Sequence, residues 1–530
     1  MKNLEIPHEN ERGRGYRFFE ILPGALSFLL ILTPVLLSLI NVTLAAFFIL
    51  AYVLIYFTRS VAVDIRALAG YRVMREHEKV DWNALLEDLE AGSVADPQAV
   101  RPKWHYDNLL RLSVQPPVLK PSEMLHAVII ATWNESKDVV EPTILSLVNA
   151  GYDVKNKIIL ILAYEERGGE QKAMESKALV EKYKDKFKYA VALEHPDGRP
   201  DEIIGKGSNL TWAGHALQEY VEKHHIDPLK VAVTTLDSDN RPHSKYFSAL
   251  SYLYCSSPDP LRASYQPLPM FTSNIWDVPA PMRVVATGNN FFYIVLTQRP
   301  HLERNFSAHA QCLKALIDME FWSMRTVVED GHQFWRSYFH FDGDYRVYPI
   351  SIPVFCDAVL ADGYVKTLKA QFVQIRRWTY GASDIAYIAN QALFRKSKAP
   401  KRDIAIKFFR LLENHVSWAT GALILLLAAF VPVLINPQSY AANELPLIVS
   451  RIQTIGLVGA LASLFVALKT LPPRPARYKR HRTIFMILQW AYLPVTTIVY
   501  GSLAAIYSQT RLVFAKYPTK FDVTAKAVRK

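Results

Sequence analysis

The chain has 530 residues, of which 50% are hydrophobic, and a formal net charge of +12. A chain of this length exceeds what one hydrophobic core organises and predicts two or more folded units. An excess of basic residues can indicate a nucleic-acid partner, but here the Lys and Arg residues lie mostly beside apolar runs, which favours a lipid bilayer instead. The three cysteines, Cys255, Cys312 and Cys356, are spaced too widely for a disulfide framework or a zinc site and fit a reducing compartment.

The N-terminal part of the chain predicts a membrane hairpin. Residues 21–58 carry no charged side chain, and as a single helix they would extend about 57 Å, roughly twice the hydrocarbon thickness of a bilayer. Two transmembrane helices joined near Asn41 fit better. Basic residues flank both ends, so the positive-inside rule places residues 1–20 and a lead-in of residues 59–124 in the cytoplasm.

Alternating strands and helices begin near residue 125. Residues 126–131, 157–163 and 231–236 are short apolar runs typical of buried strands. Helical patterns at 139–150 and 173–183 separate them. This alternation predicts a parallel α/β sheet, in which ligands bind beyond the carboxyl ends of the strands.

Acidic residues follow these strands: Glu135, Glu165 with Glu166, and the pair Asp237 and Asp239. Residues i and i+2 of an extended segment point to the same side, so Asp237 and Asp239 can face one hard cation such as Mg²⁺ or Mn²⁺. Each acid also has a plainer interpretation. D-x-D pairs arise by chance, a carboxylate favours a helix start, and loops commonly carry charges.

A glycine-containing loop and a later acidic pair add candidates. Lys206, within Gly205–Asn209, is either a surface lysine beside a turn or a ligand for a phosphate-rich group. Glu329 and Asp330 follow the aromatic pair at 321–322. A carboxylate in an aromatic-rich pocket has a raised affinity for protons, which suits a general base.

Residues 356–412 predict amphipathic helices at the membrane interface. An apolar stripe recurs there at helical spacing, at Val365, Leu368, Phe372 and Ile375. This pattern predicts a helix that lies on the membrane. Gln374, Arg377 and Trp378 share one helix face, where an amide, a guanidinium and a flat aromatic can hold a diphosphate and stack on a sugar ring. The plainer interpretation is an Arg and a Trp that anchor the helix in the membrane.

Residues 413–510 predict a second membrane region. Its first two apolar runs each fit one span, and the basic loop around Arg477 marks the cytoplasm. Residues 483–510 are also uncharged, but a single crossing there would place the basic tail, residues 511–530, outside. Because this contradicts the positive-inside rule, we expect a re-entrant or interfacial segment with its tail in the cytoplasm.

Taken in order, these residues resemble the membrane-integrated inverting glycosyltransferases of family 2, whose catalytic domain has the GT-A fold. The family signature runs as an acid after the first strand, D-x-D, T-E-D and Q-x-x-R-W. The chain matches it at Glu135, Asp237-Ser238-Asp239, Glu329-Asp330 and Gln374-x-x-Arg377-Trp378. Near the end, Phe521-Asp522-Val523-Thr524-Ala525-Lys526 is similar to the F-x-V-T-x-K gating loop of processive enzymes resembling cellulose and hyaluronan synthases.

The resemblance covers residues 125–530. It implies an α/β GT-A catalytic domain over residues 125–355, Rossmann-like and flanked by transmembrane and interfacial helices. Two departures stand out: Val328 lies where the family has Thr, and Glu165 with Glu166 where relatives usually carry aspartate.

The resemblance also implies how a nucleotide-sugar donor would be held. Glu135 and Glu165 would contact the nucleoside, with Lys206 near it. Asp237 and Asp239 would hold the diphosphate through Mg²⁺ or Mn²⁺.

The remaining matches imply the chemistry and the acceptor site. Asp330, beside Glu329, would take the proton from the acceptor hydroxyl. Trp378 would stack on the acceptor sugar with Gln374 nearby, and Gln374 and Arg377 would steady the leaving diphosphate. The gating-like residues are Phe521, Val523, Thr524 and Lys526.

The resulting expectation is a multi-pass hexosyltransferase of the cell membrane with a cytoplasmic catalytic domain. It would transfer a sugar from a nucleotide-sugar, a UDP-sugar in the first instance, to a growing polysaccharide, with possible export of the chain. The alternative is transfer of a single sugar to a lipid carrier or glycolipid. A binding or scaffold protein with an inactive domain is disfavoured, because every catalytic position is filled.

Overall fold

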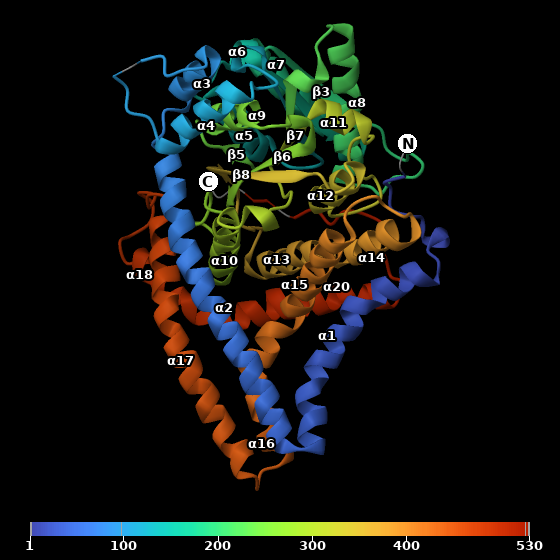
Figure 1. Ribbon diagram of the computed structural model, residues 1–530, viewed down its shortest axis with the longest axis vertical. Coiled ribbons are helices and arrows are strands. Elements are labelled where there is room, and N and C mark those ends of the chain that lie inside the picture. Colours follow the sequence, from blue (N-terminus) through green and yellow to red (C-terminus); the bar gives the residue numbers. More distant parts are fainter. Residues whose placement is uncertain (1–2, 97, 525, 528–530) are drawn as a thin grey trace.

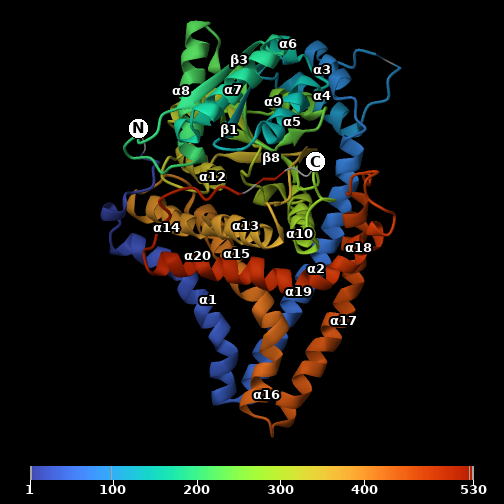
Figure 2. The ribbon, with the colours of Figure 1, turned by 180° about the vertical axis from the view of Figure 1, so that it is seen from behind.

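The computed structural model describes residues 3–96, 98–524, 526 and 527. Figure 1 shows a domain built around a β-sheet at the top and long helices that extend away below it. A layer of helices lies between these two parts, as the reverse view in Figure 2 also shows. The predicted combination of an α/β domain with apolar helices is therefore present.

One sheet contains eight strands: β1 (Leu125–Thr132), β2 (Ile158–Glu165), β3 (Tyr189–His195), β4 (Val231–Asp237), β5 (Arg241–Pro242), β6 (Ala263–Met270), β7 (Ala310–Cys312) and β8 (Arg346–Phe355). Their order across the sheet is β3-β2-β1-β4-β7-β6-β8-β5. In the parallel part, Ala131 of β1 lies opposite both Ala163 of β2 and Asp237 of β4. The carboxyl ends of these three strands are therefore level, and the residues that follow them meet at one edge.

The sheet differs from the prediction in two respects. It is mixed rather than wholly parallel, because β7 pairs antiparallel with β4 and β6. It also contains strands in segments where none was predicted, namely β3, β5, β6, β7 and β8, of which β3 lies at one edge of the sheet. Most side chains of this edge strand are only half-buried, so its sequence lacks the continuous apolar run that marks β1, β2 and β4.

Helices cover the sheet and its edges: α3 (Trp82–Ala91), α4 (Lys103–Val114), α5 (Lys137–Val148), α6 (Val154–Lys157), α7 (Glu170–Tyr183), α8 (Lys206–Lys223), α9 (Tyr246–Ser256), α10 (Ala280–Thr297), α11 (Leu313–Asp318) and α12 (Glu329–His340). Alternate residues of β1 belong to different cores. Val128 and Ile130 lie in one buried cluster, and Ala127 and Ile129 in another. Because successive strand residues point to opposite faces, the sheet has a packed core on each face.

The lead-in of residues 59–124 packs onto this domain. The rings of Trp82 in α3 and Trp104 in α4 have centroids 5.7 Å apart, and they lie 5.6 and 5.5 Å from Tyr252 of α9. Contacts between aromatic rings at such distances stabilise beyond the area they bury. The lead-in is therefore part of the folded domain rather than a linker.

Long helices form the lower part: α1 (Arg14–Ile40), α2 (Val42–His77), α15 (Lys401–Leu427), α16 (Val431–Ile435) and α17 (Tyr440–Lys469). The chain turns between α1 and α2 at Asn41, whose side chain accepts hydrogen bonds from the backbone N–H groups of Thr43 (2.8 Å) and Leu44 (3.2 Å) and so caps α2. Among the described residues, five helical stretches are long and apolar enough to cross a membrane: Arg14–Ile40, Val42–His77, Lys401–Ile435, Tyr440–Lys469 and Arg482–Val513.

The fifth stretch runs across the others rather than beside them (Figures 1 and 2). It consists of α18 (Arg482–Leu488), α19 (Leu493–Thr496), a π-helical turn and α20 (Ala504–Val513). Both of its ends reach the sheet domain. Arg482 donates to the carbonyl of Trp276 (3.3 Å), and beyond α20 the N–H of Phe521 donates to the carbonyl of Ile204 (2.8 Å).

The layer between the two parts contains α13 (Tyr364–Thr379) and α14 (Asp384–Ala389). The predicted apolar stripe of α13 does not form one exposed face. Ile375 is buried in a cluster with Tyr500 and Ala504, and the Phe372 ring lies 6.2 Å from that of Tyr507. The stripe packs against the crossing stretch because α20 lies alongside α13, whereas Val365 at its end is exposed.

Candidate active site

A buried lysine gathers three acids at the carboxyl edge of the sheet. Lys206 is the first residue of α8, and its Nζ lies 2.9 Å from Asp237 Oδ1, 2.9 Å from Asp330 Oδ2 and 3.3 Å from Glu329 Oε1. Asp237 ends β4, and the other two acids open α12. Three predicted site segments, distant in sequence, therefore meet at one ammonium group. We call these four residues the Lys206 cluster.

Charge pairing controls the protonation of this cluster. Burial alone would lower the pKa of Lys206, but Asp237, Asp330 and Glu329 together raise it well above its ordinary value. Burial would likewise raise the pKa of Asp237, yet Lys206 and Lys526 outweigh it and hold this pKa below its usual range. Both groups are therefore charged at neutral pH.

Glu329 behaves differently from its neighbours. Burial, and then the negative charge of Asp330, raise its pKa to about 7, although Lys206 and Arg377 oppose the shift. Glu329 therefore gains or loses a proton near neutral pH, with Lys206 and Arg377 close to it. Groups with such values are common at catalytic sites, although buried ion networks also produce them.

Asp330 keeps one oxygen free within the cluster. Its Oδ2 contacts Lys206, whereas its buried Oδ1 has no hydrogen-bond partner among the residues that the structure describes. His309 faces this oxygen, with its Nδ1 3.9 Å away, but that nitrogen is hydrogen bonded to the carbonyl of Phe306 (2.8 Å). A buried acceptor without a partner costs free energy, so a hydroxyl group that donates a hydrogen bond to this oxygen would bind favourably there.

A second lysine binds the other acid of the D-x-D pair. Lys526 Nζ lies 2.5 Å from Asp239 Oδ1 and 3.0 Å from the hydroxyl of Ser238. Asp239 Oδ2 accepts from the N–H of Asp357 (3.0 Å). Burial, and then the nearby Asp239, raise the pKa of the Asp357 side chain to about 6. Lys526 thus supplies positive charge to Asp239, whereas Asp357 pairs with Arg241 at 3.3 Å.

Asp237 and Asp239 have the chemistry of a divalent cation site, because two carboxylates at one strand end are ligands that Mg²⁺ and Mn²⁺ prefer. In this structure each of their four oxygens has a partner: Lys206 and Ser307 on Asp237, and Lys526 with the Asp357 N–H on Asp239. Across the described part of the chain, no three or more His, Cys, Asp or Glu side chains gather as a metal site. Lys526 therefore contacts one of the Asp239 oxygens that a cation at this position would use.

The C-terminal tail crosses the site. The backbone of Lys520 pairs with that of Ile204 in an isolated β-bridge, and the backbone of Lys526 pairs in the same way with that of Leu360. Between these anchors, the ring of Phe521 lies 3.8 Å from the guanidinium carbon of Arg377, and Thr524 is buried. The gating-like residues, with Val523 among them, therefore run from Ile204, just before α8, past Arg377 of α13 to Asp239.

The Q-x-x-R-W residues divide into two environments. Arg377 is half-buried beside the Lys206 cluster; its partial burial lowers its pKa, and Glu329, Asp237 and Asp330 counteract this. Gln374 accepts a hydrogen bond from Gln371 (3.0 Å), and the ring of Trp378 lies 5.9 Å from that of Phe271. Arg377 thus lies with the acids of the cluster, whereas Trp378 contacts Phe271.

The predicted nucleoside contacts lie at the far end of the same edge. Glu135 accepts from the N–H of Trp133 (2.8 Å), and its negative charge helps to raise the pKa of Lys526. Glu165 is buried and paired with Arg167 through both oxygens, one of them 3.0 Å from Nη2, and Arg167 stacks on the Trp133 ring at 4.2 Å. An open hollow of about 320 Å³ adjoins them, lined by Glu165, Arg167, His195, Gly198 and Glu202 among others.

Three contact residues of the site carry no signal in the sequence. Ser307 donates to Asp237 (2.7 Å), His309 faces Asp330, and Asp357 faces Asp239. They lie on separate segments and match no motif, so only the fold brings them together. The cysteines take no part in disulfides: all three are free and buried.

No protein-family model matches the chain, and a search of curated proteins finds no match. Among solved structures, the chain is similar to mannosyltransferase PcManGT from Pyrobaculum calidifontis, solved with GDP-Man and Mn²⁺, at 15% identity and a TM-score of 0.40, over 86% of this chain and 100% of the other. It is also similar to residues 1–349 of S. aureus TarS, at 11% identity and a TM-score of 0.35, over 74% of this chain and 93% of the other. The UDP complex of the same TarS fragment gives 11% identity and 0.35, over 76% and 94%. At these TM-scores the likeness assigns no function to this chain.

Proposed function

We propose that this chain is a membrane-bound inverting glycosyltransferase of family 2. It transfers a sugar from a nucleotide-sugar to a growing polysaccharide, and the expected donor is a UDP-sugar. The observation that carries the proposal is the Lys206 cluster together with Arg377 beside it: two cations and three acids from four separate segments meet at the carboxyl edge of the sheet. Ligands bind at this edge in α/β sheets.

Positive charge at this edge supports a diphosphate leaving group. A nucleoside diphosphate gains negative charge as it departs, and fixed cations in a buried site stabilise that charge strongly. Lys206 and Arg377 supply it, one from α8 and one from α13. Asp237 and Asp239 would hold Mg²⁺ or Mn²⁺, which would offset further charge on the diphosphate.

Asp330 is the general base in this proposal. Its unpartnered Oδ1 can accept the proton of an acceptor hydroxyl, while Lys206 donates to Oδ2 and holds the carboxylate in place. One base and direct displacement imply inversion at the anomeric carbon. A retaining enzyme would instead need a second carboxylate as a nucleophile.

The remaining predicted residues take supporting roles. Glu135 and Glu165 would contact the nucleoside beside the open hollow at β2 and β3, and Trp378 would stack on the acceptor sugar with Gln374 beside it. The tail would act as a gate, because its Lys526 must leave Asp239 before a metal ion binds there.

Incubation of membranes that contain the chain with labelled UDP-glucose, UDP-N-acetylglucosamine and GDP-mannose tests the proposal. We expect incorporation of label from one of them, its loss in EDTA, and its loss in Asp330→Asn. A polymer that a glycan hydrolase degrades indicates a polysaccharide synthase, whereas label in a single lipid-linked sugar indicates the alternative acceptor. Donor binding without turnover for every sugar tested would contradict both.

The proposed location is the cell membrane, with the sheet domain in the cytoplasm. The loop around Arg477 contacts the sheet domain, since Arg477 pairs with Asp277 at 2.7 Å, whereas the turn at Gln438 lies between α16 and α17 at the opposite end (Figure 1). Single cysteines placed at these two positions, probed with an impermeant thiol reagent on intact cells, should label at Gln438 and not at Arg477. The reverse pattern would refute the orientation.

A further inference from the structure

The N-terminal segment of the chain binds to the sheet domain as a strap, which we define as residues 3–7. Leu4 and Ile6 are buried. The backbone carbonyl of Leu4 accepts from the Tyr387 hydroxyl (2.9 Å) and from Arg336 (3.1 Å), and that of Ile6 accepts from Arg325 (3.1 Å). The segment is thus held by side chains rather than by secondary structure.

Glu5 makes the charged contacts of the strap. Its Oε2 lies 3.1 Å from Nη1 of Arg336, and its Oε1 accepts from the hydroxyl of Ser323. Arg336 is buried on α12, and no other carboxylate pairs with it within the described residues. A buried guanidinium without a counter-ion is strongly destabilising, so Glu5 completes this site.

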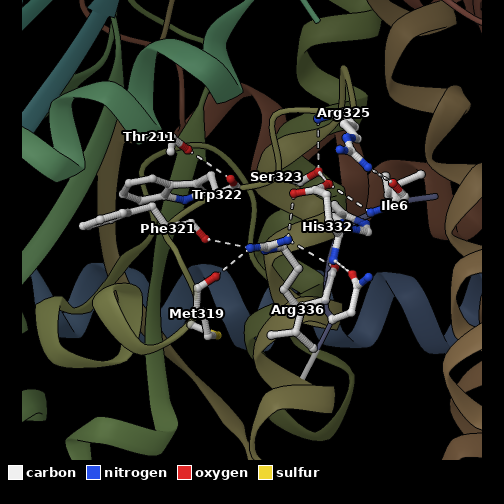
Figure 3. Close-up of polar contacts among 12 residues, drawn as sticks. Ile6, Thr211, Met319, Phe321, Trp322, Ser323, Arg325, His332 and Arg336 are labelled. Carbon is white, nitrogen blue, oxygen red and sulfur yellow. Dashed lines mark hydrogen bonds and ion pairs between the residues drawn. The ribbon is translucent and has the colours of Figure 1, made fainter. Parts of the chain in front are cut away.

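Arg336 also holds the loop that leads to the acids of α12. Its Nη2 donates to the carbonyls of Met319 (2.7 Å) and Phe321 (3.4 Å), as Figure 3 shows. Glu320 and Phe321 both adopt left-handed backbone conformations, with φ of 57° and 59°. Such conformations are uncommon for residues other than glycine and persist only where surrounding contacts hold them.

The other side of this loop packs against α8, the helix that begins at Lys206. Thr211 donates to the carbonyl of Trp322 (3.0 Å; Figure 3). A Cβ atom on Gly207 would lie 2.5 Å from the Ser323 carbonyl and 3.3 Å from Cβ of Glu329. The loop is therefore clamped between the strap and the start of α8, and Ser323 touches both.

From this geometry we infer that Glu5 is a positioning residue, which acts through Ser323 and Arg336 to fix the loop at 319–328 and so to hold Glu329 and Asp330 against Lys206. The inference rests on the proposed function for its effect on catalysis. Because small displacements of catalytic groups lower rates strongly, loss of the Glu5 carboxylate should reduce turnover without removing any group of the Lys206 cluster.

Glu5→Ala in the full chain tests this, with Glu9→Ala as the matched control, since Glu9 is exposed on the same segment. We expect kcat per folded molecule to fall roughly ten- to a hundredfold in Glu5→Ala, while affinity for UDP with Mn²⁺ stays within about threefold. Glu5→Gln, which keeps one acceptor oxygen but not the charge, should lie between. In an Arg336→Lys background the further loss should be small, because the two residues act through one contact.

Hydrogen exchange of residues 319–332 supplies a readout that does not depend on turnover. Faster exchange there in Glu5→Ala, and not in Glu9→Ala, is expected. If the parent chain transfers no sugar and exchange still rises, the proposed function fails while the positioning role stands. A parental kcat with unchanged exchange, or a lower folded yield with parental kcat per folded molecule, would overturn the positioning role.

Discussion

Two lysines pair with the acids of this site, and they lie in different parts of the fold. Lys206 begins a helix of the sheet domain and contacts three carboxylates, whereas Lys526 lies on the C-terminal tail and contacts one. Removal of Lys206 would leave three acids, of which Glu329 is buried, without this cation. Under the proposed function, withdrawal of Lys526 would free one carboxylate for a metal ion. Under the proposed function, Lys206 is therefore a fixed cation of the site and Lys526 one that a metal ion replaces.

The largest effect is expected for Asp330→Asn, which tests whether the Lys206 cluster catalyses the reaction. An amide can still accept a hydrogen bond but cannot take up the acceptor proton, so we expect kcat to fall by roughly two to four orders of magnitude. Donor affinity should stay within about threefold, because a base acts mainly in the transition state. Turnover, UDP affinity and melting temperature of the purified variant measure these effects. A folded variant with near-parental turnover would remove Asp330 from the mechanism.

Exchange of each lysine for methionine separates the fixed cation from the exchangeable one. Lys206→Met should lower the free energy of unfolding by about 3–5 kcal/mol, because it leaves buried acids unpaired. Lys526→Met should lower it by less, because it removes the partner of one carboxylate, Asp239, instead of three. Thermal unfolding in detergent compares the two variants directly. Equal losses of stability would contradict the distinction between them.

Metal binding tests whether Lys526 is exchangeable. In Lys526→Ala the Asp239 carboxylate no longer has the ammonium group as a competitor, so the apparent Kd for Mn²⁺ should fall roughly tenfold. Lys520→Ala is the matched control, because Lys520 lies on the same tail and is exposed. Titration of Mn²⁺ followed by electron paramagnetic resonance gives both values. Unchanged affinity in Lys526→Ala would mean that the tail does not compete with the metal.

The smallest effect concerns the pH dependence of stability within the Lys206 cluster. The pKa of Glu329 is raised from 4.5 to about 7 in the folded chain, so the folded state holds a proton that the unfolded state has already released. This contribution is fully present below pH 4.5 and is lost as the pH rises through about 7. Glu329→Gln lacks this dependence, and its melting temperature relative to the parent should therefore rise between pH 5 and pH 7.5. A constant difference would show that Glu329 titrates normally.

Local sequence patterns determined much of this architecture. The apolar runs at β1, β2 and β4, each followed by an acid, predicted both the strands and the edge at which Asp237 and Asp239 lie. The uncharged stretches predicted long apolar helices, and the break at Asn41 follows from its capping side chain. These features depend on residues close together in the chain, where periodicity and capping act directly.

Only the tertiary structure decided which charges meet. Nothing near Lys206 in the sequence shows that it contacts Glu329 and Asp330, and nothing in the tail motif shows that Lys526 reaches Asp239. The strand β3 and the packing of the α13 stripe against α20 also escaped prediction, because an edge strand lacks a continuous apolar run and an apolar stripe does not specify what covers it. Burial and pairing of charges are properties of distant segments brought together, and they appear only once the chain has folded.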